Sequence, residues 1–338
     1  MKKKQLLGII ITGLVIIAVG VTGVLGNVIT AKLTEAQEPT KGFWESFMDM
    51  GVSEEMILPE EDFIGLIRVE GEIMPNTDDI WGVSTSGYDH NLYMDYVDAL
   101  MYAENNKGIL LYINSPGGTV YESDELYLKL MEYKQETKRP IYAYFGSQAC
   151  SGGYYIAMAA DHIVANRNCW LGSIGVIVSL MNCKDLYEKL GIKEIDITSG
   201  ANKTMGSAAL DLTDEQYAIL QGLVDEAYDQ FVDIVSTGRN MDDATVRKLA
   251  DGRIYSTKQA LENKLIDAEG SLEDVKTALE KQLKIENGVL YDEPVHSLNS
   301  VMSMFYSALQ SLKPQTDTEL AKDIMENNGN GVLKYYAK

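Results

Sequence analysis

Apolar runs typical of strands alternate with segments of helical periodicity between Phe63 and Thr198. Residues 64–73 alternate apolar and polar side chains, and residues 108–114 and 140–145 are apolar almost throughout, as buried parallel strands are. Residues 91–104, between the first and the second of these runs, repeat apolar side chains at helical spacing. This order predicts an α/β fold with a parallel sheet joined by crossover helices. A spiral of short parallel units and a doubly wound sheet both fit, and the periodicity does not separate them.

Helix starts are marked by capping boxes, in which a Ser or Thr is followed three residues later by Glu or Gln. The pattern occurs at Thr119–Glu122, Thr213–Gln216 and Ser256–Gln259. It predicts three helices, of which the first ends near Lys134 and the third near Lys264. The second helix carries an apolar stripe, which packs into the core or forms a subunit interface. The stripe consists of Leu220, Leu223, Val224, Ala227, Phe231, Ile234 and Val235. Short strands are also predicted at Ile163–Ala165 and Gly191–Thr198.

The N-terminus has the sequence of a membrane anchor. Lys2, Lys3 and Lys4 precede an uncharged run from Gln5 to Ala31, long enough to cross a hydrocarbon core of ~30 Å as a helix. A cleaved signal peptide is the alternative, although the apolar run is longer than that of a usual signal peptide. The lysines keep the N-terminus in the cytoplasm. We therefore expect a single-pass protein of the cell membrane whose folded part is extracellular.

Composition divides the chain into four parts. Residues 1–33 hold the cytoplasmic lysines and the transmembrane anchor, and residues 34–62 form an acidic stalk. Residues 63–284 form the main folded domain, and residues 285–338 are a C-terminal extension with a flexible tail. The formal net charge of −21 argues against nucleic acid as a partner, because phosphate binding needs a basic surface. Membrane lipid is the partner of the N-terminal helix.

The three cysteines carry little information about function. Cys150, Cys169 and Cys183 form no CxxC pattern, so we expect no metal site. We expect no cofactor either. Burial as a small apolar side chain is expected for Cys150. Cys169 and Cys183 could form a disulfide, which the sequence leaves open.

Ser151 is the strongest candidate for a nucleophile. It precedes Gly152 and Gly153, after an apolar run, and is predicted to begin a helix that continues to Ala160. The N–H of Gly152 at such a helix start points where an oxyanion forms, and the helix N-terminus favours negative charge. The alternative role for Ser151 is that of a simple helix N-cap.

Lys203 is the candidate base for this serine. It follows a Gly-containing turn among small and apolar residues, and desolvation lets a lysine act as a base. Ser173, in a Leu-Gly-Ser-Ile-Gly segment, is a candidate for orienting Lys203. His162 is a weaker alternative base, since it lies where a helix is predicted to end and a capping role suffices.

A second glycine pair lies in Tyr112-Ile-Asn-Ser-Pro-Gly-Gly118. It follows a predicted buried strand and precedes a helix, where open α/β sheets place their sites. Glycines there leave backbone N–H groups free to face a ligand and to form an oxyanion hole. An ordinary Pro-Gly turn is the alternative.

Five motifs in this order resemble those of the signal peptide peptidase A family, in its short Gram-positive form with one catalytic domain. They are Asn114-Ser-Pro-Gly-Gly118, Ser147-Gln-Ala-Cys-Ser-Gly-Gly-Tyr-Tyr155, Gly172-Ser-Ile-Gly-Val176, Ser199-Gly-Ala-Asn-Lys203 and Ala250-Asp-Gly-Arg-Ile-Tyr-Ser256. The resemblance covers Phe63 to about Leu279, together with the N-terminal anchor.

This resemblance implies a fold like that of Clp protease and crotonase, a spiral of parallel β-β-α units. It implies Ser151 as nucleophile, Lys203 as general base, and an oxyanion hole from the N–H groups of Gly118 and Gly152. It also implies a ring-shaped homo-oligomer whose catalytic groups face inward, with sharing between subunits as an option. The activity expected from it is that of a serine endopeptidase with a Ser-Lys dyad, cutting apolar peptides such as remnant signal peptides.

Two other functions are weighed against this one. The first is an acyl-CoA enzyme on the related crotonase-like fold, which the exported location disfavours. The second is a non-catalytic membrane protein that binds peptides and gives resistance to membrane-active peptides. Separately, Val332–Lys338 is an apolar and aromatic tail that could enter an active site of its own ring as an inhibitor, or be a disordered terminus.

Overall fold

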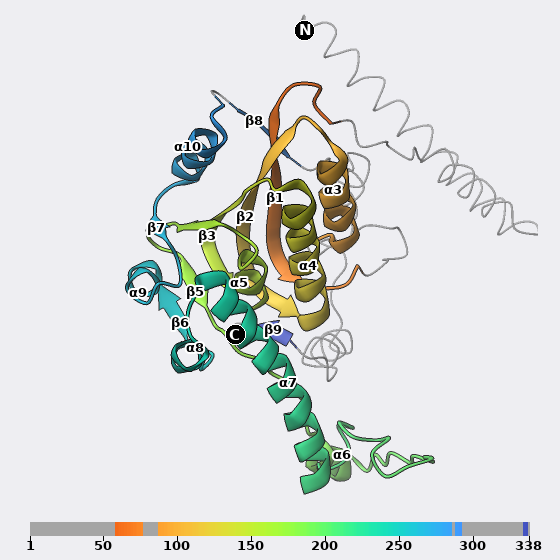
Figure 1. Ribbon diagram of the computed structural model, residues 1–338. Helices are drawn as coiled ribbons and strands as arrows, with labels where there is room; N and C mark the ends of the chain where they lie inside the picture. Colours follow the sequence, from red (N-terminus) through yellow and green to blue (C-terminus); the bar gives the residue numbers. More distant parts are fainter. Residues whose placement is uncertain (1–57, 77–86, 286–287, 293–333, 337–338) are drawn as a thin grey trace, which may run out of the picture. The chain divides into compact units, whose positions relative to one another are not determined.

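Parallel strands form the centre of the described molecule (Figure 1). The computed structural model describes residues 58–76, 87–285, 288–292 and 334–336, all within one unit, Met56–Lys338. Its three long strands are β1 (Phe63–Ile73), β2 (Asn106–Thr119) and β3 (Ile141–Cys150). They are neighbours in the sheet, β2 pairs in parallel with both others, and their carboxyl ends meet at one edge.

Beyond β3 the sheet divides. The shorter strands are β4 (His162–Ala165), β5 (Trp170–Gly172), β6 (Ile254–Ser256), β7 (Ala268–Glu269) and β8 (Val289–Asp292). The first half of β3 pairs with β4, which pairs with β7, whereas the second half pairs with β5, which pairs antiparallel with β6. β8, from beyond Lys284, adds to the free edge of β1. This division fits the predicted spiral of short units.

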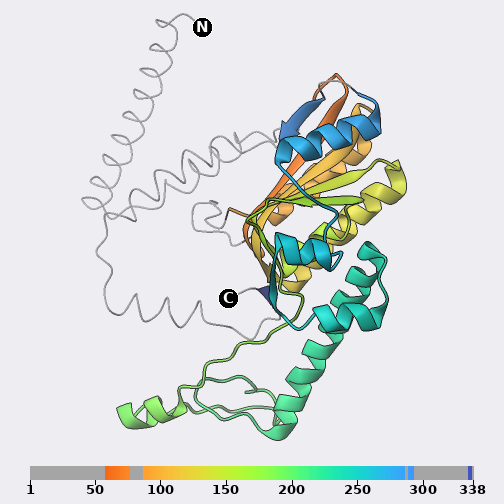
Figure 2. The same ribbon diagram turned by 90° about the vertical axis from the view of Figure 1, so that its left-hand side faces the viewer.

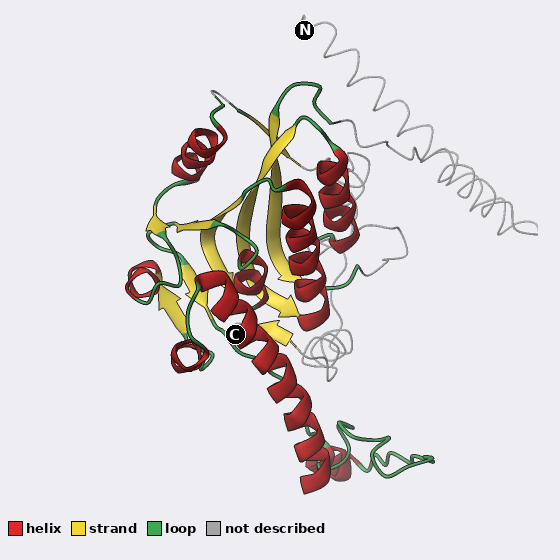
Figure 3. Cartoon of the chain, in the orientation of Figure 1, coloured by secondary structure: helices red, strands yellow, loops and turns green. Residues whose placement is uncertain are grey.

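Helices cover both faces of the sheet (Figure 3). One face is covered by α3 (His90–Tyr102), α4 (Val120–Thr137) and α5 (Gly152–Ala157), and the other by α10 (Leu272–Leu283). Alternate residues of β1 enter the two cores: Ile67 and Val69 join the large one, and Ile64 and Leu66 pack with α10. Burial on both faces explains the nearly continuous apolar runs in the sequence.

The apolar stripe of α7 (Asp214–Arg239) is divided between core and surface. Ala227, Phe231 and Val235 are buried, and the Phe231 ring lies 5.0 Å from that of Tyr155. Leu223, one turn before Ala227, is 45% exposed. Two smaller helices, α8 (Asp243–Leu249) and α9 (Thr257–Glu262), follow. The capping boxes predicted at Thr213 and Ser256 are confirmed.

Residues 176–213, which include α6 (Lys184–Leu190), form an arm that projects from the sheet with the first half of α7 (Figure 2). The strand predicted at Gly191–Thr198 is wrong, since this stretch has no regular structure. Within it, Ile195 and Ile197 are 85% and 99% exposed. A strand needs a paired neighbour, and within the described chain this stretch has none.

Two other boundaries differ from the prediction. β2 continues through the Pro-Gly-Gly segment to Thr119, because β1 continues beside it and pairs Ile73 with Gly118. The helix expected up to Ala160 ends at Ala157. The capping box at Thr119 is not formed, although α4 begins where expected: the Thr119 side chain makes no cap hydrogen bond.

The predicted anchor and most of the stalk, residues 1–57, lie outside the described residues, as do residues 293–333 of the C-terminal extension. Among the helices that are described, none has the length and apolar character needed to span a bilayer.

Asp267 holds three elements together on one side of the sheet. Its carboxylate accepts hydrogen bonds from the Ile163 amide of β4 at 2.7 Å and from Arg239 of α7 at 2.7 and 3.1 Å. Burial alone would raise the pKa of Asp267, but the Arg239 and Ile163 hydrogen bonds outweigh burial and hold the pKa below its usual range.

We predict that Asp267→Asn lowers the free energy of unfolding by roughly 2 kcal/mol near neutral pH, because it removes one partner of a part-buried ion pair. The folded-state pKa is depressed, so this stabilisation is present above the unfolded pKa of about 3.9 and is lost as the pH falls through the folded value. Urea unfolding at several pH values measures it, with Asp243→Asn, in an exposed pair with Arg247, as control. Equal losses in both variants, or a loss independent of pH, would contradict the prediction.

Candidate active site

Ser151 occupies the sharp turn between β3 and α5. Its backbone has φ 53° and ψ −116°, a conformation that a residue with a side chain rarely adopts. The Ser151 N–H donates a hydrogen bond of 2.7 Å to the carbonyl of Gly172, which fixes the turn to β5. The Ser151 side chain makes no cap hydrogen bond, so the simple N-cap alternative is wrong.

The Ser151 hydroxyl is fully buried, and its Oγ has no hydrogen-bond partner among the described residues. Buried hydroxyl groups without a partner are uncommon, since each costs about 1–3 kcal/mol. An unpartnered hydroxyl on a strained backbone marks a functional position better than a structural one.

The predicted oxyanion residues lie together beside this serine. A Cβ atom placed on Gly152 would lie 3.3 Å from the Gly118 nitrogen, so the two glycines are in contact. A Cβ on Gly118 would lie 1.8 Å from the carbonyl oxygen of Ile73, so no side chain fits there. The structure therefore unites Ser151, Gly118 and Gly152, whose N–H groups could stabilise an oxyanion.

Ser115 is a residue of the site that the sequence reasoning missed. Its buried hydroxyl donates to the Gly71 carbonyl at 2.6 Å and accepts from the Gly117 N–H at 3.1 Å. It thereby ties the end of β2 to a bulge in β1 and holds the glycine turn. A serine directly before Pro-Gly-Gly is the signal that could have indicated this role.

Among the described residues of one chain, Lys203 forms no hydrogen bond with Ser151. It lies on the arm, its side chain is exposed, and its backbone N–H closes a turn with Gly200 at 3.2 Å. Figures 1 and 2 both show the arm directed away from the sheet that carries Ser151. The described part of a single chain therefore does not assemble the Ser-Lys pair.

Ser173 lies beside Ser151, not on the arm. It follows Gly172, whose carbonyl accepts the Ser151 N–H, and its own N–H donates to Arg253 at 2.8 Å. Ser173 is buried and has a φ of 47°. Ser173 can therefore contact Lys203 only if Lys203 itself comes close to Ser151.

His162 is excluded as a base for Ser151. Its register partner is Tyr142, at the start of β3, whereas Ser151 follows the end of that strand. The separation along the strand is roughly 25 Å. His162 instead lies 3.7 Å from Asp267.

A short strand from the C-terminus lies against the site. β9 (Lys334–Tyr336) pairs antiparallel with the end of β2, with Tyr336 opposite Gly117 and Tyr335 opposite Gly118. The sequence left open whether the tail enters an active site of its own ring or is a disordered terminus, and this pairing places Lys334–Tyr336 beside the candidate site of the same chain. The edge of β2 at Gly117–Thr119 is thus paired with an extended segment of the chain's own C-terminus.

All three cysteines are free, so the described chain holds no Cys169–Cys183 disulfide. Cys150 and Cys169 are buried, as predicted for Cys150, and burial raises the pKa of each thiol to about 12. Neither is therefore a rival nucleophile.

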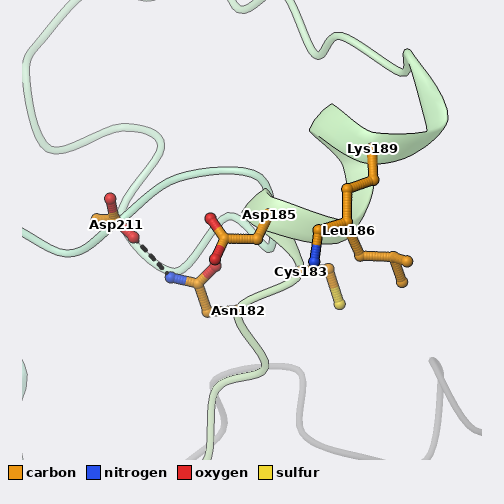
Figure 4. Close-up of a pocket in the computed structure, with 6 residues that line it drawn as sticks. All are labelled: Asn182, Cys183, Asp185, Leu186, Lys189 and Asp211. Atoms are coloured by element: carbon orange, nitrogen blue, oxygen red, sulfur yellow. Dashed lines mark hydrogen bonds between the residues drawn. The ribbon is translucent and has the colours of Figure 1, made fainter.

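A hollow of about 400 Å³ lies on the arm, away from these residues (Figure 4). It is lined by Asn182, Cys183, Asp185, Leu186, Lys189 and Asp211. None of these residues belongs to the predicted site, and Asn182 donates a hydrogen bond of 2.9 Å to Asp211 across it. We assign it no catalytic role.

A buried serine on a strand-to-helix turn, next to paired glycine amides, is the arrangement of a serine hydrolase. Residues 133–286 match Peptidase family S49, and residues 83–169 match Clp protease. The Clp-like α/β fold expected from the motifs is thereby confirmed.

Three relatives show how far the similarity extends. A protein of Enterococcus faecium, named as a candidate signal peptide peptidase SppA, is 40% identical over 209 residues, 62% of this chain and 60% of the relative. A candidate protease of Synechocystis sp. is 43% identical over 53% of this chain and 64% of its own length. A candidate protease of Methanocaldococcus jannaschii is 34% identical over 64% of this chain and 70% of its own length.

The chain belongs to peptidase family S49, and its class is that of the serine peptidases. It spans less than two thirds of the length of the first two relatives, 60% and 64%.

We predict that Ser151→Gly raises the free energy of unfolding by about 1–3 kcal/mol, since glycine relieves the positive φ and the buried hydroxyl is removed. Ser151→Ala removes the hydroxyl but keeps the strained backbone, so its gain should be smaller. Thermal unfolding of the three proteins measures both effects. Equal or lower stability of Ser151→Gly relative to the parent protein would show that the turn stores no strain.

Proposed function

We propose that this protein is a membrane-anchored serine endopeptidase that degrades signal peptides left in the membrane after preprotein processing. The observation that carries the proposal is the buried, unpartnered Ser151 hydroxyl beside the amides of Gly118 and Gly152. Membership of peptidase family S49 supports peptide-bond hydrolysis, and the name of the Enterococcus faecium relative supports the substrate class.

In the proposed mechanism Ser151 Oγ attacks the peptide carbonyl while unprotonated Lys203 Nζ accepts its proton. The N–H groups of Gly118 and Gly152 stabilise the negative oxygen of the tetrahedral intermediate. Lys203 returns the proton to the leaving amine as the C–N bond breaks, leaving an acyl-enzyme on Ser151. Water then attacks the ester while Lys203 accepts its proton. Lys203 gives that proton to Ser151 Oγ as the ester C–O bond breaks, which releases the second product and restores the free serine.

Lys203 reaches Ser151 from a neighbouring copy in a ring-shaped homo-oligomer under this proposal. Three features support it: Ser151 Oγ has no partner among the described residues, Lys203 is exposed, and the arm carries exposed apolar side chains. The largest exposed fractions on the arm belong to Leu190, Ile195 and Ile197. Ser173, beside Ser151, orients the incoming lysine.

Substrates bind as an added strand on β2. The pairing of β9 with Gly117–Thr119 supports this mode, because an extended peptide in the same register lies beside the amide of Gly118. The backbone supplies the hydrogen bonds, so affinity does not depend on one particular sequence.

The domain plan expected from the sequence is part of the proposal. Residues 1–33 anchor the chain with its N-terminus in the cytoplasm, residues 34–62 form a stalk, residues 63–284 form the extracellular peptidase domain, and residues 285–338 extend it. The lysines at the N-terminus and the uncharged run after them support this orientation.

We predict that the full protein hydrolyses a fluorogenic apolar peptide and that Ser151→Ala and Lys203→Ala each lose the activity while keeping fold and assembly. Co-expression of the two variants should restore it at about a quarter of the sites, because each restored site needs one intact residue from each of two copies. Peptide hydrolysis by the mixed, purified oligomer measures this.

No recovery in the mixture would mean that one chain supplies both residues. Equal activity in all three proteins would leave Ser151 and Lys203 without a catalytic role. If none of the proteins cuts, binding of CoA and of peptides separates the acyl-CoA and peptide-binding alternatives.

We also predict that kcat/KM rises from neutral into mildly alkaline pH. The reason is that the general base must be unprotonated before it accepts the Ser151 proton. Initial rates with one peptide across a series of buffers give the profile. A flat or acid-shifted profile, in a protein that stays folded across the range, would contradict a lysine base.

A further inference from the structure

The start of α4 differs from the starts of three other helices in this chain. At α7, α9 and α10 the residue three positions after the N-cap bonds back to the N-cap amide, which completes a capping box. At α4 the sequence offers the same pattern, Thr119 and Glu122, but no cap hydrogen bond forms. Neither the Thr119 nor the Glu122 side chain therefore caps the N-terminus of α4.

These two side chains instead bond to each other next to the peptide-binding edge. The Thr119 hydroxyl donates to a Glu122 carboxylate oxygen and also lies 3.3 Å from the Ile73 carbonyl. Glu122 is only 6% exposed, and no Lys or Arg of the described residues forms an ion pair with it. A carboxylate enclosed in this way without a cation is costly, which favours a role in binding.

The other charged side chains described near Glu122 do not neutralise the negative charge of its carboxylate. Asp89 and Glu125 are the neighbouring acids at the starts of α3 and α4, and His90 is hydrogen-bonded to Glu125 at 3.1 Å. Burial, and then the charges of Tyr93, Glu122, Asp89 and Glu125, raise the pKa of Tyr88 well above its usual value. The potential at this end of the two helices is thus negative.

The register of β9 places a basic residue at this point. Thr119 pairs with Lys334, and α4 lies beside β9. The peptide position opposite Thr119 is therefore the one nearest to the Thr119–Glu122 pair. It lies two residues before the position opposite Gly117, on the same strand.

We propose that Glu122 forms a subsite that selects a Lys or Arg side chain at the peptide position paired with Thr119. This inference rests on the proposed peptide-binding function of the same edge, and it adds a charge preference to the apolar substrate class. Glu122 makes contact with the bound side chain and not with the reacting bond, so it determines specificity. The helix dipole also stabilises an acidic side chain in the first turn, but that stabilisation does not require the carboxylate to be buried.

The test measures binding of labelled peptides to the full chain carrying Ser151→Ala, so that nothing is cut. The parent peptide is Asn-Gly-Val-Leu-Lys-Tyr-Tyr-Ala-Lys, the sequence of residues 330–338, and its fifth residue is Lys, Gln or Glu. Fluorescence anisotropy gives Kd for each. We expect the Lys peptide to bind about tenfold more tightly than the Gln peptide, as a part-buried ion pair would give.

Adding Glu122→Gln should abolish the preference, and adding Glu122→Lys should shift it to the Glu peptide. Glu132→Gln, which removes an exposed acid from the far end of the same helix, should leave it unchanged. Equal Kd values for the Lys and Gln peptides on the parent, or a preference that survives Glu122→Gln, would overturn the subsite.

Hydrolysis by the protein with Ser151 intact separates this inference from the proposed function. Cleavage of all three peptides at equal rates would refute the subsite and leave the peptidase standing. A Glu122-dependent binding preference without any Ser151-dependent cleavage would refute the peptidase and leave the subsite standing.

Discussion

The backbone of Gly118 lies against the carbonyl oxygen of Ile73, and the geometry of the whole site depends on that contact. Because no side chain fits between them, the end of β2 stays in the sheet past Pro116 and brings its last amides to the turn after β3. Ser115 fixes the same stretch from the other side through Gly71 and Gly117. One tight approach thus positions the amides of Gly118 and Gly152, the strand edge that pairs with β9, and the start of α4 together.

Around this close contact, some polar and apolar groups have no partner or only an unusual one among the described residues. The Ser151 hydroxyl has no described partner, the Thr119–Glu122 pair does not cap its helix, and the arm exposes apolar side chains. Each costs stability in an isolated chain, and under the proposed function a bound peptide or a second copy supplies the missing contacts. The well-packed cores on both faces of the sheet supply the stability that makes such exceptions tolerable.

Sequence reasoning succeeded where local pattern determines structure. The order of strands and helices, the capping boxes at Thr213 and Ser256, and the grouping of Gly118, Gly152 and Ser151 all follow from short motifs in a parallel sheet. It failed where the outcome depends on distant partners. Ile195 and Ile197 have strand spacing but no neighbouring strand, and the capping pattern at Thr119 yielded to a contact with Ile73. The distance between Ser151 and Lys203 was not predictable, because no local signal specifies how an arm is directed.

The distribution of the cysteines has a practical consequence. Cys150, directly before Ser151, is buried and its thiol has a raised pKa, as has Cys169, so alkylating reagents should spare both near neutral pH. Cys183 is part-exposed and lies on the arm, in the hollow of Figure 4. Of the three cysteines, Cys183 is therefore the one whose thiol such reagents reach, and it lies on the projecting arm. A fluorophore attached there would report the surroundings of the arm without an engineered cysteine.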